Sequence, residues 1–499
     1  MLEDKYGGTA VIALNAPAGY LGWPADKHTA WHETGHAIFE PLIVGRPDGT
    51  YVPHLAEDFK IDLEEQTITF WLRQGVKFHD GSELNAEGVK WHFDNFREFA
   101  GDKIRWEGEV VDEYTFRIRY VEGESFENTD LTYFSSEMAA FITCKAAFDA
   151  HGEEWCRRNP IGTGPFKCVE YELESHCVLE KFEDYWQESL PYLDRIRIEY
   201  IPEATTVRDA MIAGDIIACR RGGPDNVASE LINKHGFEFE GGLQATIVFL
   251  FDRIANAEIN HPTSNLKVRQ AMEHAINREE LVDTVGFGII DEPAYQYLPP
   301  GYTGRDPNFE HREYNPEKAK QLLAEAGYPD GFDVTIYFHM DVSQDFGIAI
   351  QSYLAEVGIK AELQWTTPTA YLEYRFNSDR GPGVILCEPR PSAPNTNSFP
   401  IGLFSKDAAF GFAKALPYYV TEDEYEEFYE LWEKTRKSIN VDAELVRPVF
   451  QFIHDHALHV PLAYFGRLYV WNGDVLQDPG FYSMGDSTVW PYENWWLKK

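Results

Sequence analysis

The stretch that most constrains the fold of this 499-residue chain covers residues 265–285, because it specifies two consecutive helices almost residue by residue. Asn277 is a typical N-cap residue, and Glu280 three positions later would complete a capping box for the second helix. We therefore predict two short helices that meet at Asn277. The first helix carries an apolar stripe at helical spacing, made of Val268, Ala271, Met272, Ala275 and Ile276.

The chain that follows predicts an α/β lobe. Asn315 and Pro316 are typical of the N-cap and first position of a helix, which we expect over residues 317–326 and which Gly327 ends. Two parallel strands joined by a helix, a βαβ unit, are then predicted over residues 332–338, 343–357 and 359–365.

Length and charge narrow the class of protein. A chain of 499 residues exceeds the size at which one core keeps growing, so two or three domains are expected. The net charge of -38 would repel phosphate backbones, which excludes nucleic-acid binding. No apolar run approaches the ~20 residues of a membrane span. The first residues show neither a basic segment nor an apolar one, so no signal peptide is visible.

Four motifs stand in order along the chain, at residues 78–89, 162–186, 213–216, and 266–285 together with 314–329. With these motifs the chain resembles the extracellular solute-binding proteins that serve peptide, nickel and opine ABC importers. The resemblance implies a two-lobed α/β fold of the periplasmic-binding-protein type (type II), with an extra subdomain in the first lobe, and an extracytoplasmic location if an export signal has been removed, in the periplasm or lipid-anchored at the cell surface.

The resemblance also predicts the domain boundaries. Lobe I is expected to be discontinuous, the extra subdomain to cover residues 46–160, and lobe II to cover residues 244–468. We place the first crossover between lobes near residues 242–246, because the paired glycines there can absorb changes of backbone dihedral. The return crossover is expected near residues 465–470. Lobe I then consists of residues 1–45, 161–243 and 469–499.

The function implied by the resemblance is capture of a solute between the lobes by hinge closure and its delivery to the membrane permease of an ABC importer. The default ligand of the family is an oligopeptide; an oligosaccharide, a small organic acid or a metal chelate are the alternatives. We expect a monomer without a cofactor. The chain shows no nucleophile–base pair, phosphate loop or dinucleotide fingerprint, so we expect no catalysis.

Two aromatic residues are the first ligand-binding candidates. Tyr20 and Trp23 lie in a Gly/Pro-rich loop after an apolar strand over residues 9–14. In the resembling family this loop faces the ligand. The alternative is that both side chains cover the core of their own loop.

A second set of candidates lies in residues 384–399. In resembling peptide binders an acidic residue of this loop holds the ligand's α-ammonium, but alignment on residues 403–405 places Ser392 at that position. Glu388 could substitute for the acid, whereas Arg390 would suit an anion. We also expect ligand contacts from Asn395 in this loop and from Thr246 at the first crossover.

A basic pair stands out in this acidic chain. Arg220 and Arg221 directly follow a short strand and could bind a carboxylate or phosphate bidentately. The favoured alternative is that the two arginines neutralise local acidic side chains.

Residues 32–36 match the zinc motif HExxH, in which two histidines one helical turn apart bind the metal and the glutamate activates water. His28 precedes His32 by four residues and could extend the same face of a helix predicted up to Pro41. No further histidine ligand follows His36 in the expected pattern. Solvated or core histidines are therefore the preferred interpretation, a surface metal site the second, and a zinc metalloprotease a distant alternative.

The six cysteines fit no CxxC pattern, but one pair is suggestive. If a two-residue loop at Glu172-Leu173, or a four-residue loop around it, joins the strands over residues 166–171 and 177–182, Cys168 faces Cys177. Facing β-carbons on antiparallel neighbours lie ~4.5–5.5 Å apart, close to what a disulfide needs. We predict this bridge in an oxidising compartment.

Overall fold

The computed structural model forms two compact units. Unit 1 comprises Met1–Arg221, Glu230–Gly241 and Leu468–Lys499, and unit 2 comprises Gly222–Ser229 and Gly242–Arg467. The structure describes residues 3–15, 17, 19–23, 32–46, 50–100, 104–135, 138–221, 225–241, 245–251, 259–289, 292–339, 342–365, 384–391, 415–439, 441–484 and 487–499.

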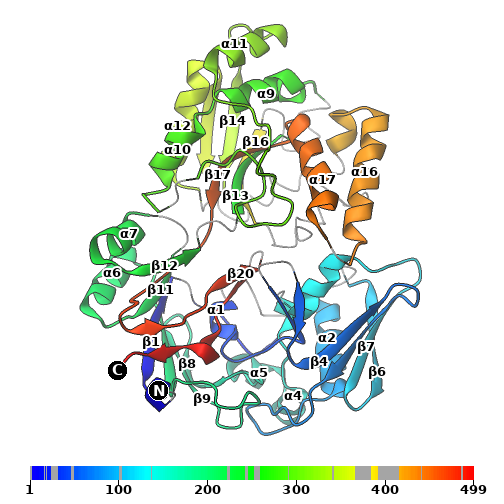
Figure 1. The fold of residues 1–499 in the computed structure, drawn as a ribbon, viewed down its shortest axis with the longest axis vertical. Coiled ribbons are helices and arrows are strands. Elements are labelled where there is room, and N and C mark those ends of the chain that lie inside the picture. Colours follow the sequence, from blue (N-terminus) through cyan, green and yellow to red (C-terminus); the bar gives the residue numbers. More distant parts are fainter. Residues whose placement is uncertain are drawn as a thin grey trace. The chain divides into compact units, whose positions relative to one another are not determined.

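A seven-stranded sheet is the centre of unit 1 (Figure 1). Its strands are β1 (Thr9–Leu14), β8 (Phe166–Glu172), β9 (His176–Lys181), β10 (Arg195–Tyr200), β11 (Ala218–Arg221), β12 (Glu238–Gly241) and β18 (Leu468–Trp471). Their order is β12-β18-β11-β1-β10-β9-β8. The central strand β1 runs parallel to β10 and β11, and the remaining pairs are antiparallel. The alternating apolar residues of β1 thus pack into a core to which the C-terminal aromatic residues contribute.

A second core lies in unit 1 within the region 42–156. A sheet of order β4-β5-β7-β6 packs there against helix α2, whose residue Phe93 stacks on Phe116 of β7 with ring centroids 5.6 Å apart. The helix therefore buries an apolar face against this sheet. The elements are β4 (Ala56–Asp62), β5 (Thr67–Leu72), β6 (Trp106–Asp112), β7 (Thr115–Tyr120), α2 (Ala86–Ala100), α3 (Thr132–Ser135), α4 (Lys145–His151) and α5 (Glu153–Arg158).

The remaining elements of unit 1 are short. Antiparallel pairs join β2 to β3, β19 to β22 and β20 to β21, and α6 follows strand β10. Their bounds are α1 (His32–Gly35), β2 (Ile43–Gly45), β3 (Tyr51–Pro53), α6 (Ala204–Ala213), β19 (Leu476–Gln477), β20 (Tyr482–Met484), β21 (Ser487–Val489) and β22 (Trp496–Leu497).

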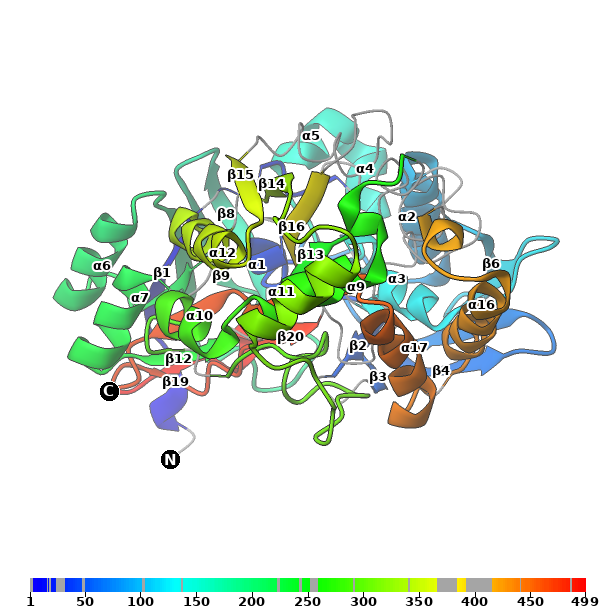
Figure 2. The ribbon, with the colours of Figure 1, turned by 90° about the horizontal axis from the view of Figure 1, so that it is seen from above.

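Unit 2 is built on a five-stranded sheet of order β15-β14-β16-β13-β17. β14 is parallel to β15 and β16, and β13 is antiparallel to β16 and β17. Helices α16 and α17 lie side by side in both ribbon views (Figure 1, Figure 2). The strands are β13 (Ala245–Leu250), β14 (Asp333–Phe338), β15 (Lys360–Trp365), β16 (Val384–Pro391) and β17 (His459–Phe465), and the helices are α7 (Asn226–Ser229), α9 (Leu266–His274), α10 (Arg278–Val285), α11 (Pro316–Glu325), α12 (Gln344–Glu356), α16 (Glu422–Arg436) and α17 (Ala443–Asp455).

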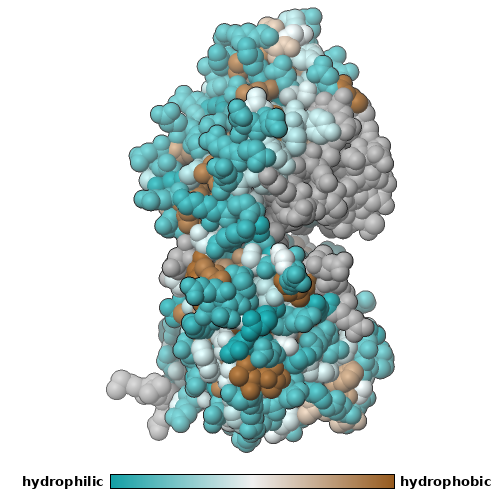
Figure 3. Space-filling model, turned by 90° about the vertical axis from the view of Figure 1, so that its right-hand side faces the viewer, coloured by the Kyte–Doolittle hydropathy of each residue, from teal (hydrophilic) through white to brown (hydrophobic). Residues whose placement is uncertain are grey.

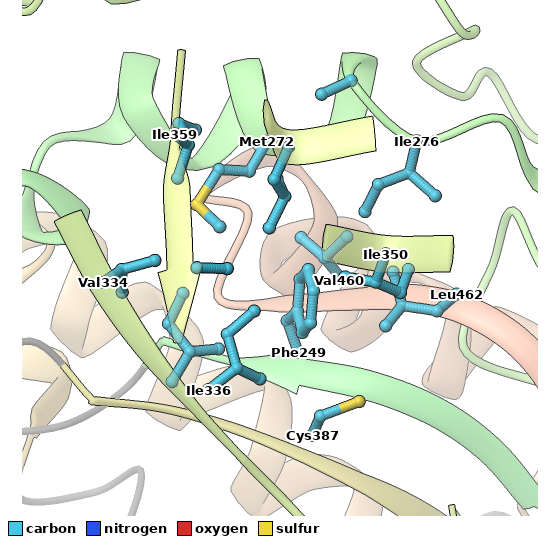
Figure 4. Close-up of a cluster of buried hydrophobic side chains, with 14 of the residues drawn as sticks. Phe249, Met272, Ile276, Val334, Ile336, Ile350, Ile359, Cys387, Val460 and Leu462 are labelled. Carbon is cyan, nitrogen blue, oxygen red and sulfur yellow. The ribbon is translucent and has the colours of Figure 1, made fainter. Parts of the chain in front are cut away.

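The predicted helix pair occupies the core of unit 2. Met272 and Ile276 point toward the sheet residues Phe249 and Ile336 in one apolar cluster (Figure 4). The Asn277 side chain accepts a hydrogen bond from the backbone N–H of Glu280 at 3.3 Å, so Asn277 is the N-cap of α10. The return bond of a capping box is replaced by one from the Asn277 amide to the Glu280 carboxylate. The predicted α11, β14, α12 and β15 are also confirmed.

The face of the molecule shown in Figure 3 is mainly hydrophilic, with hydrophobic residues gathered in separate small patches. This agrees with the acidic composition, because charged side chains are costly to bury and stay on the surface. Among the described helices, none has the length and apolar character needed to cross a bilayer.

Two local predictions are wrong. The helix expected up to Pro41 ends at Gly35, because glycine is a poor helix former and the chain then turns toward strand β2. The hairpin of β8 and β9 is joined by Leu173, Glu174 and Ser175, with Glu174 at φ 64°. This three-residue loop and a bulge between Cys168 and Glu170 place Cys177 opposite Tyr171 instead of Cys168.

Candidate ligand-binding cavity in unit 1

A cavity of about 590 Å³ lies within unit 1. Its size, and its mixture of apolar walls with a few polar groups, are typical of small-molecule sites. Its wall combines segments that are far apart in the sequence. The lining residues are His36, Phe39, Glu40, Pro41, Val44, Arg46, Val52, His54, Ser135, Phe141, Pro165, Tyr185, Gln187, Gly480, Trp490, Pro491, Glu493 and Asn494.

Glu40 joins these segments. Its buried carboxylate accepts hydrogen bonds from Thr163 Oγ1 at 2.8 Å and from Tyr185 OH at 2.7 Å. Trp186 Nε1 donates to both carboxylate oxygens, at 3.0 and 3.1 Å, and His54 Nε2 lies 3.0 Å from Oε1. Burial, together with the Glu40 charge, raises the pKa of Tyr185 well above its usual value, so this hydroxyl stays protonated and donates. The acceptor sites of Glu40 are thus used to hold the wall of the cavity in place.

Two of the motifs found in the sequence, residues 78–89 and 162–186, pack together next to this wall. A Cβ at Gly162 would lie 2.0 Å from the carbonyl oxygen of Ile38, so only glycine allows the two backbones to approach this closely. His79 of the other motif bonds to the Gly164 carbonyl through Nε2 at 2.9 Å, and burial lowers its pKa to about 4. The neutral imidazole therefore has a structural role, and the motif positions Thr163 for its bond to Glu40.

Glu493 is the other carboxyl group at the cavity. Burial raises the pKa of Glu493 to about 7, although a hydrogen bond to its own backbone and the nearby His54 act to lower it; the charge of Glu40 adds to the rise. Asn494 Nδ2 donates to Oε1 at 3.3 Å. Within the described part of the chain, no lysine or arginine forms an ion pair with Glu493. Among the described residues, Asn494 is the one side chain that donates a hydrogen bond to Glu493, whereas Glu40 has four side-chain partners.

Three further groups of the cavity wall have a buried polar atom that finds no hydrogen-bond partner among the described residues: His36 Nε2, Ser135 Oγ and Trp490 Nε1. His36 Nδ1 accepts from the backbone N–H of Trp490 at 3.2 Å, which leaves the proton of the neutral ring on Nε2. Burial lowers the pKa of His36 to about 3, so the ring is neutral at pH 7. Buried polar groups are nearly always hydrogen-bonded in native proteins, so these atoms suit a bound ligand.

The HExxH motif lies at the short helix α1 of unit 1. His32 and Glu33 are buried, and Glu33 Oε1 lies 3.0 Å from Arg220 Nε in an ion pair. His28 lies outside the described residues. The described residues contain no group of three or more His, Cys, Asp or Glu side chains arranged to hold a metal ion.

The predicted basic pair is also engaged within the protein. Besides its ion pair with Glu33, Arg220 donates to Asn15 Oδ1 at 3.2 Å. Arg221 is 8% exposed, and neither arginine is part of the cavity wall. This geometry agrees with the alternative interpretation, in which Arg220 neutralises a local acid.

Tyr20 and Trp23 do not line the cavity. Trp23 is buried and stacks on Phe148, with ring centroids 5.0 Å apart. The Tyr20 ring lies 5.4 Å from the guanidinium of Arg158, which also donates to its hydroxyl at 3.3 Å. Trp23 thus packs on the second core of unit 1 through Phe148, whereas Tyr20 contacts Arg158.

The candidates in unit 2 are described only in part. Thr246 is buried, and its hydroxyl donates to the carbonyl of Tyr297 at 2.7 Å. Glu388 and Arg390 lie on strand β16, where the structure describes the backbone alone, and Asn395 lies outside the described residues. Their roles in ligand binding stay predictions.

Cys168 and Cys177 are free thiols in the structure. Although their backbones are not opposite each other, their Sγ atoms are 3.7 Å apart on neighbouring strands. The bridge itself stays a prediction.

Sequence reasoning missed the carboxyl groups that matter most at the cavity. Glu40 stands alone in an apolar stretch, which was a usable signal because an isolated carboxylate there needs donors from elsewhere in the fold. Glu493 lies among four aromatic residues near the C-terminus, and a similar signal applies to it. Neither pattern shows which segments supply the partners.

Comparisons with known proteins agree on one family. The chain matches the family model of bacterial extracellular solute-binding proteins, family 5 Middle, over residues 50–410. Heme-binding protein A of Haemophilus influenzae is 28% identical over 412 residues, which are 73% of this chain and 71% of that protein. Glutathione-binding protein GsiB of Salmonella typhi is 31% identical over 62% of this chain, and the match spans 60% of the length of GsiB.

Solved structures extend the likeness to the whole chain. DppA of Helicobacter pylori, an ABC transporter-associated periplasmic binding protein in complex with the peptide STSA, matches with a TM-score of 0.78 and 24% sequence identity. The match covers 100% of this chain and 99% of DppA. The α/β periplasmic-binding-protein fold predicted from the motifs is therefore confirmed. Members of this family bind solutes and are not enzymes, which rules out the metalloprotease alternative. The chain belongs to the bacterial extracellular solute-binding proteins of family 5.

Proposed function

We propose that this protein is the extracytoplasmic receptor of an ABC importer and captures its solute at the cavity of unit 1. The supporting observation is the cavity of about 590 Å³, whose wall includes aromatic rings and three hydrogen-bonding atoms without a partner among the described residues. Binding there followed by transfer to a membrane permease is consistent with the family and with the protein's whole-chain likeness to DppA. The protein would act in the periplasm or as a lipid-anchored monomer at the cell surface.

An oligopeptide is the first ligand class that we propose. The related proteins have names that refer to heme, glutathione and a peptide, so the fold accommodates ligands of several chemical classes. Two of those three ligands are peptide-like. An oligosaccharide, a small organic acid and a metal chelate are the alternatives to be tested beside peptides.

We propose that capture involves closure of the two units. The chain passes between them at several points, including residues 241–242 and 467–468. Gly241 has φ 104°, a conformation that other residues rarely adopt, and it precedes a second glycine. A ligand would favour the closed state only to the extent that it binds that state more tightly. Small-angle X-ray scattering should then show a smaller radius of gyration with ligand than without.

Native mass spectrometry of the purified protein, followed by a thermal-shift screen, tests the proposal. The screen should contain peptides, oligosaccharides, organic acids and metal chelates. A ligand at 100 times its dissociation constant stabilises the folded state by about 2.7 kcal/mol, which a thermal shift detects. The variant Val44→Trp places a large side chain at the cavity wall and should weaken binding. Failure of every class, or binding that Val44→Trp leaves unchanged, would contradict the assignment of this cavity.

A further inference from the structure

We propose that Glu33 and Arg220 are positioning residues, whose ion pair couples the cavity wall to the strand ends where the chain leaves unit 1. Glu33 is the glutamate of the HExxH motif, and neither side chain lines the cavity. The inference rests on the proposed function, because it assigns a role in solute capture to two residues outside the binding site. The pair joins helix α1 to strand β11.

Three of the points at which the chain passes between the units lie side by side. Arg221, Gly241 and Leu468 are the residues of unit 1 at these points. Leu468 of β18 pairs with Arg221 of β11 on one side and with Gly241 of β12 on the other. A movement of one unit relative to the other therefore changes backbone dihedrals next to these three strand ends. Arg220 directly precedes this group.

Glu33 lies at the other end of the connection, in the helical turn that leads to the cavity. His36 follows this turn, lines the cavity and donates its backbone N–H to the His32 carbonyl at 3.0 Å. The C-terminal segment holds the same turn at two places. Tyr492 OH donates to the Glu33 carbonyl at 2.7 Å, and the Trp490 N–H donates to His36 Nδ1 at 3.2 Å. A displacement of this part of the wall therefore reaches Glu33 through hydrogen bonds.

The ion pair closes the connection. Arg220 Nε lies 3.0 Å from Glu33 Oε1, and Arg220 Nη1 donates to Oδ1 of Asn15, directly after β1, at 3.2 Å. The Glu33 side chain is 1% exposed and that of Arg220 11%. Because the effective dielectric constant is lower inside a protein than in water, opposite charges this close resist separation more strongly than a surface pair does. A shift of the β11 end is thus transmitted to α1.

Stability alone does not account for this pair. Both carboxylate oxygens of Glu33 and Nε of Arg220 are buried, and none of them has a hydrogen bond of good geometry among the described residues. By contrast, Arg105 donates to both carboxylate oxygens of Asp130, at 2.9 and 3.1 Å. A buried pair costs desolvation energy, and hydrophobic residues of similar volume often replace it without loss of stability. A pair that lacks such bonds is better suited to holding two segments in register than to stabilising the fold.

A double-mutant cycle without ligand tests whether the two side chains act together. Glu33→Met and Arg220→Met each leave one buried charge without its partner, so each variant should unfold at a lower urea concentration than wild type. Glu33→Met/Arg220→Met removes both charges and should recover most of that loss or exceed the stability of wild type. Additive losses in the double variant would overturn the proposal.

Binding and closure distinguish a coupling pair from a merely structural one. The probes are trialanine for peptides and cellotriose for sugars. By calorimetry, the double variant should bind the probe that wild type binds at least tenfold more weakly, because binding no longer gains from closure. At saturating probe, its radius of gyration should decrease by less than half as much as that of wild type. As the control, Glu180→Met/Arg195→Met removes an exposed Glu–Arg pair from the same sheet and should match wild type in both measurements.

The outcomes separate this inference from the proposed function. If Val44→Trp blocks a probe but the double variant binds it with wild-type affinity and contracts as wild type does, the coupling is wrong while the cavity assignment stands. A double variant that loses affinity yet contracts fully at saturation also contradicts the coupling. If neither probe nor any solute class of the thermal-shift screen binds at the cavity, the proposed function is wrong and this inference fails with it.

Discussion

The buried guanidinium of Arg278 donates from Nε to the carbonyl oxygen of Pro461 at 2.8 Å, and so ties helix α10 to strand β17. The bond falls where β17 shifts register against β13, near Pro461, and therefore satisfies a carbonyl at an irregular point of the sheet. Arg269 of α9 acts in the same way on the carbonyls of His456 and Ala457 just before the strand. Both arginines lie within residues 265–285, the stretch for which the sequence predicts two consecutive helices. This stretch therefore also stabilises the sheet of unit 2.

Removal of Arg278 should strongly destabilise unit 2. Arg278→Met leaves the Pro461 carbonyl without its donor and leaves the buried Glu273 without one of its two cationic neighbours. Breaking a buried charged interaction in this way costs about 3–5 kcal/mol. Urea unfolding followed by tryptophan fluorescence measures the change. As the control, Lys267→Met removes an exposed ion pair to Glu325 and should cost less than about 1 kcal/mol. Equal effects of the two substitutions would contradict the assigned role of Arg278.

His36 should make the stability of unit 1 sensitive to acid. Its pKa is lowered by burial from 6.5 to about 3, so the unfolded state binds the proton more readily than the folded state does. The contribution of His36 is therefore fully present above pH 6.5 and is lost as the pH falls from 6.5 toward 3, at up to ~1.4 kcal/mol per pH unit. His36→Asn keeps an acceptor for the Trp490 N–H but does not titrate. The stability of this variant should fall less steeply over that range in parallel unfolding series, and identical slopes would exclude the role of His36.

Gly162 should not tolerate a side chain. A Cβ there would meet the Ile38 carbonyl oxygen at 2.0 Å, and a backbone atom can move aside only by distorting the segment that carries Glu40. Gly162→Ala should cost about 1–3 kcal/mol of unfolding free energy and weaken ligand binding at the cavity. Gly88→Ala, in helix α2 with no close contact, should instead stabilise the protein by up to about 1 kcal/mol. Thermal unfolding with and without ligand distinguishes the two variants.

Cys168 and Cys177 should form a disulfide when the protein is oxidised. Their Sγ atoms, 3.7 Å apart, need only a small side-chain movement to bond. A bridge that closes so short a loop stabilises by about 2–3 kcal/mol in the chain-entropy model. Mass spectrometry after alkylation without reduction should recover the two cysteines in one cross-linked peptide pair. Alkylated thiols at both positions in protein purified from an oxidising compartment would show that the prediction is wrong.

Local signals in the sequence were enough for the helices and strands of unit 2 over residues 266–365 and for strands β1, β8 and β9 of unit 1. Caps such as Asn277, Asn315 and Ser343 act within one helical turn, and the apolar periods of α9 and β14 are visible in short windows. The helix expected up to Pro41 shows the limit of this approach, because Gly35 ends it and tertiary contacts set the path that follows. The hairpin of Cys168 and Cys177 shows another limit, since one bulge changes which residues face each other.

By itself, the sequence determined which segments become helices and strands and which family the chain resembles, because caps, periodicity and motifs act between residues close in the chain. Only the tertiary structure decided the chemistry of the cavity. Glu40 and Glu493 are 453 positions apart in the numbering of the sequence, and one carboxyl is saturated with donors while the other is not. That difference comes from Thr163, Tyr185, Trp186 and His54, whose polar atoms folding brings within hydrogen-bond distance of Glu40. Burial and hydrogen bonds from distant segments set the charge of a carboxyl group, and no local pattern records them.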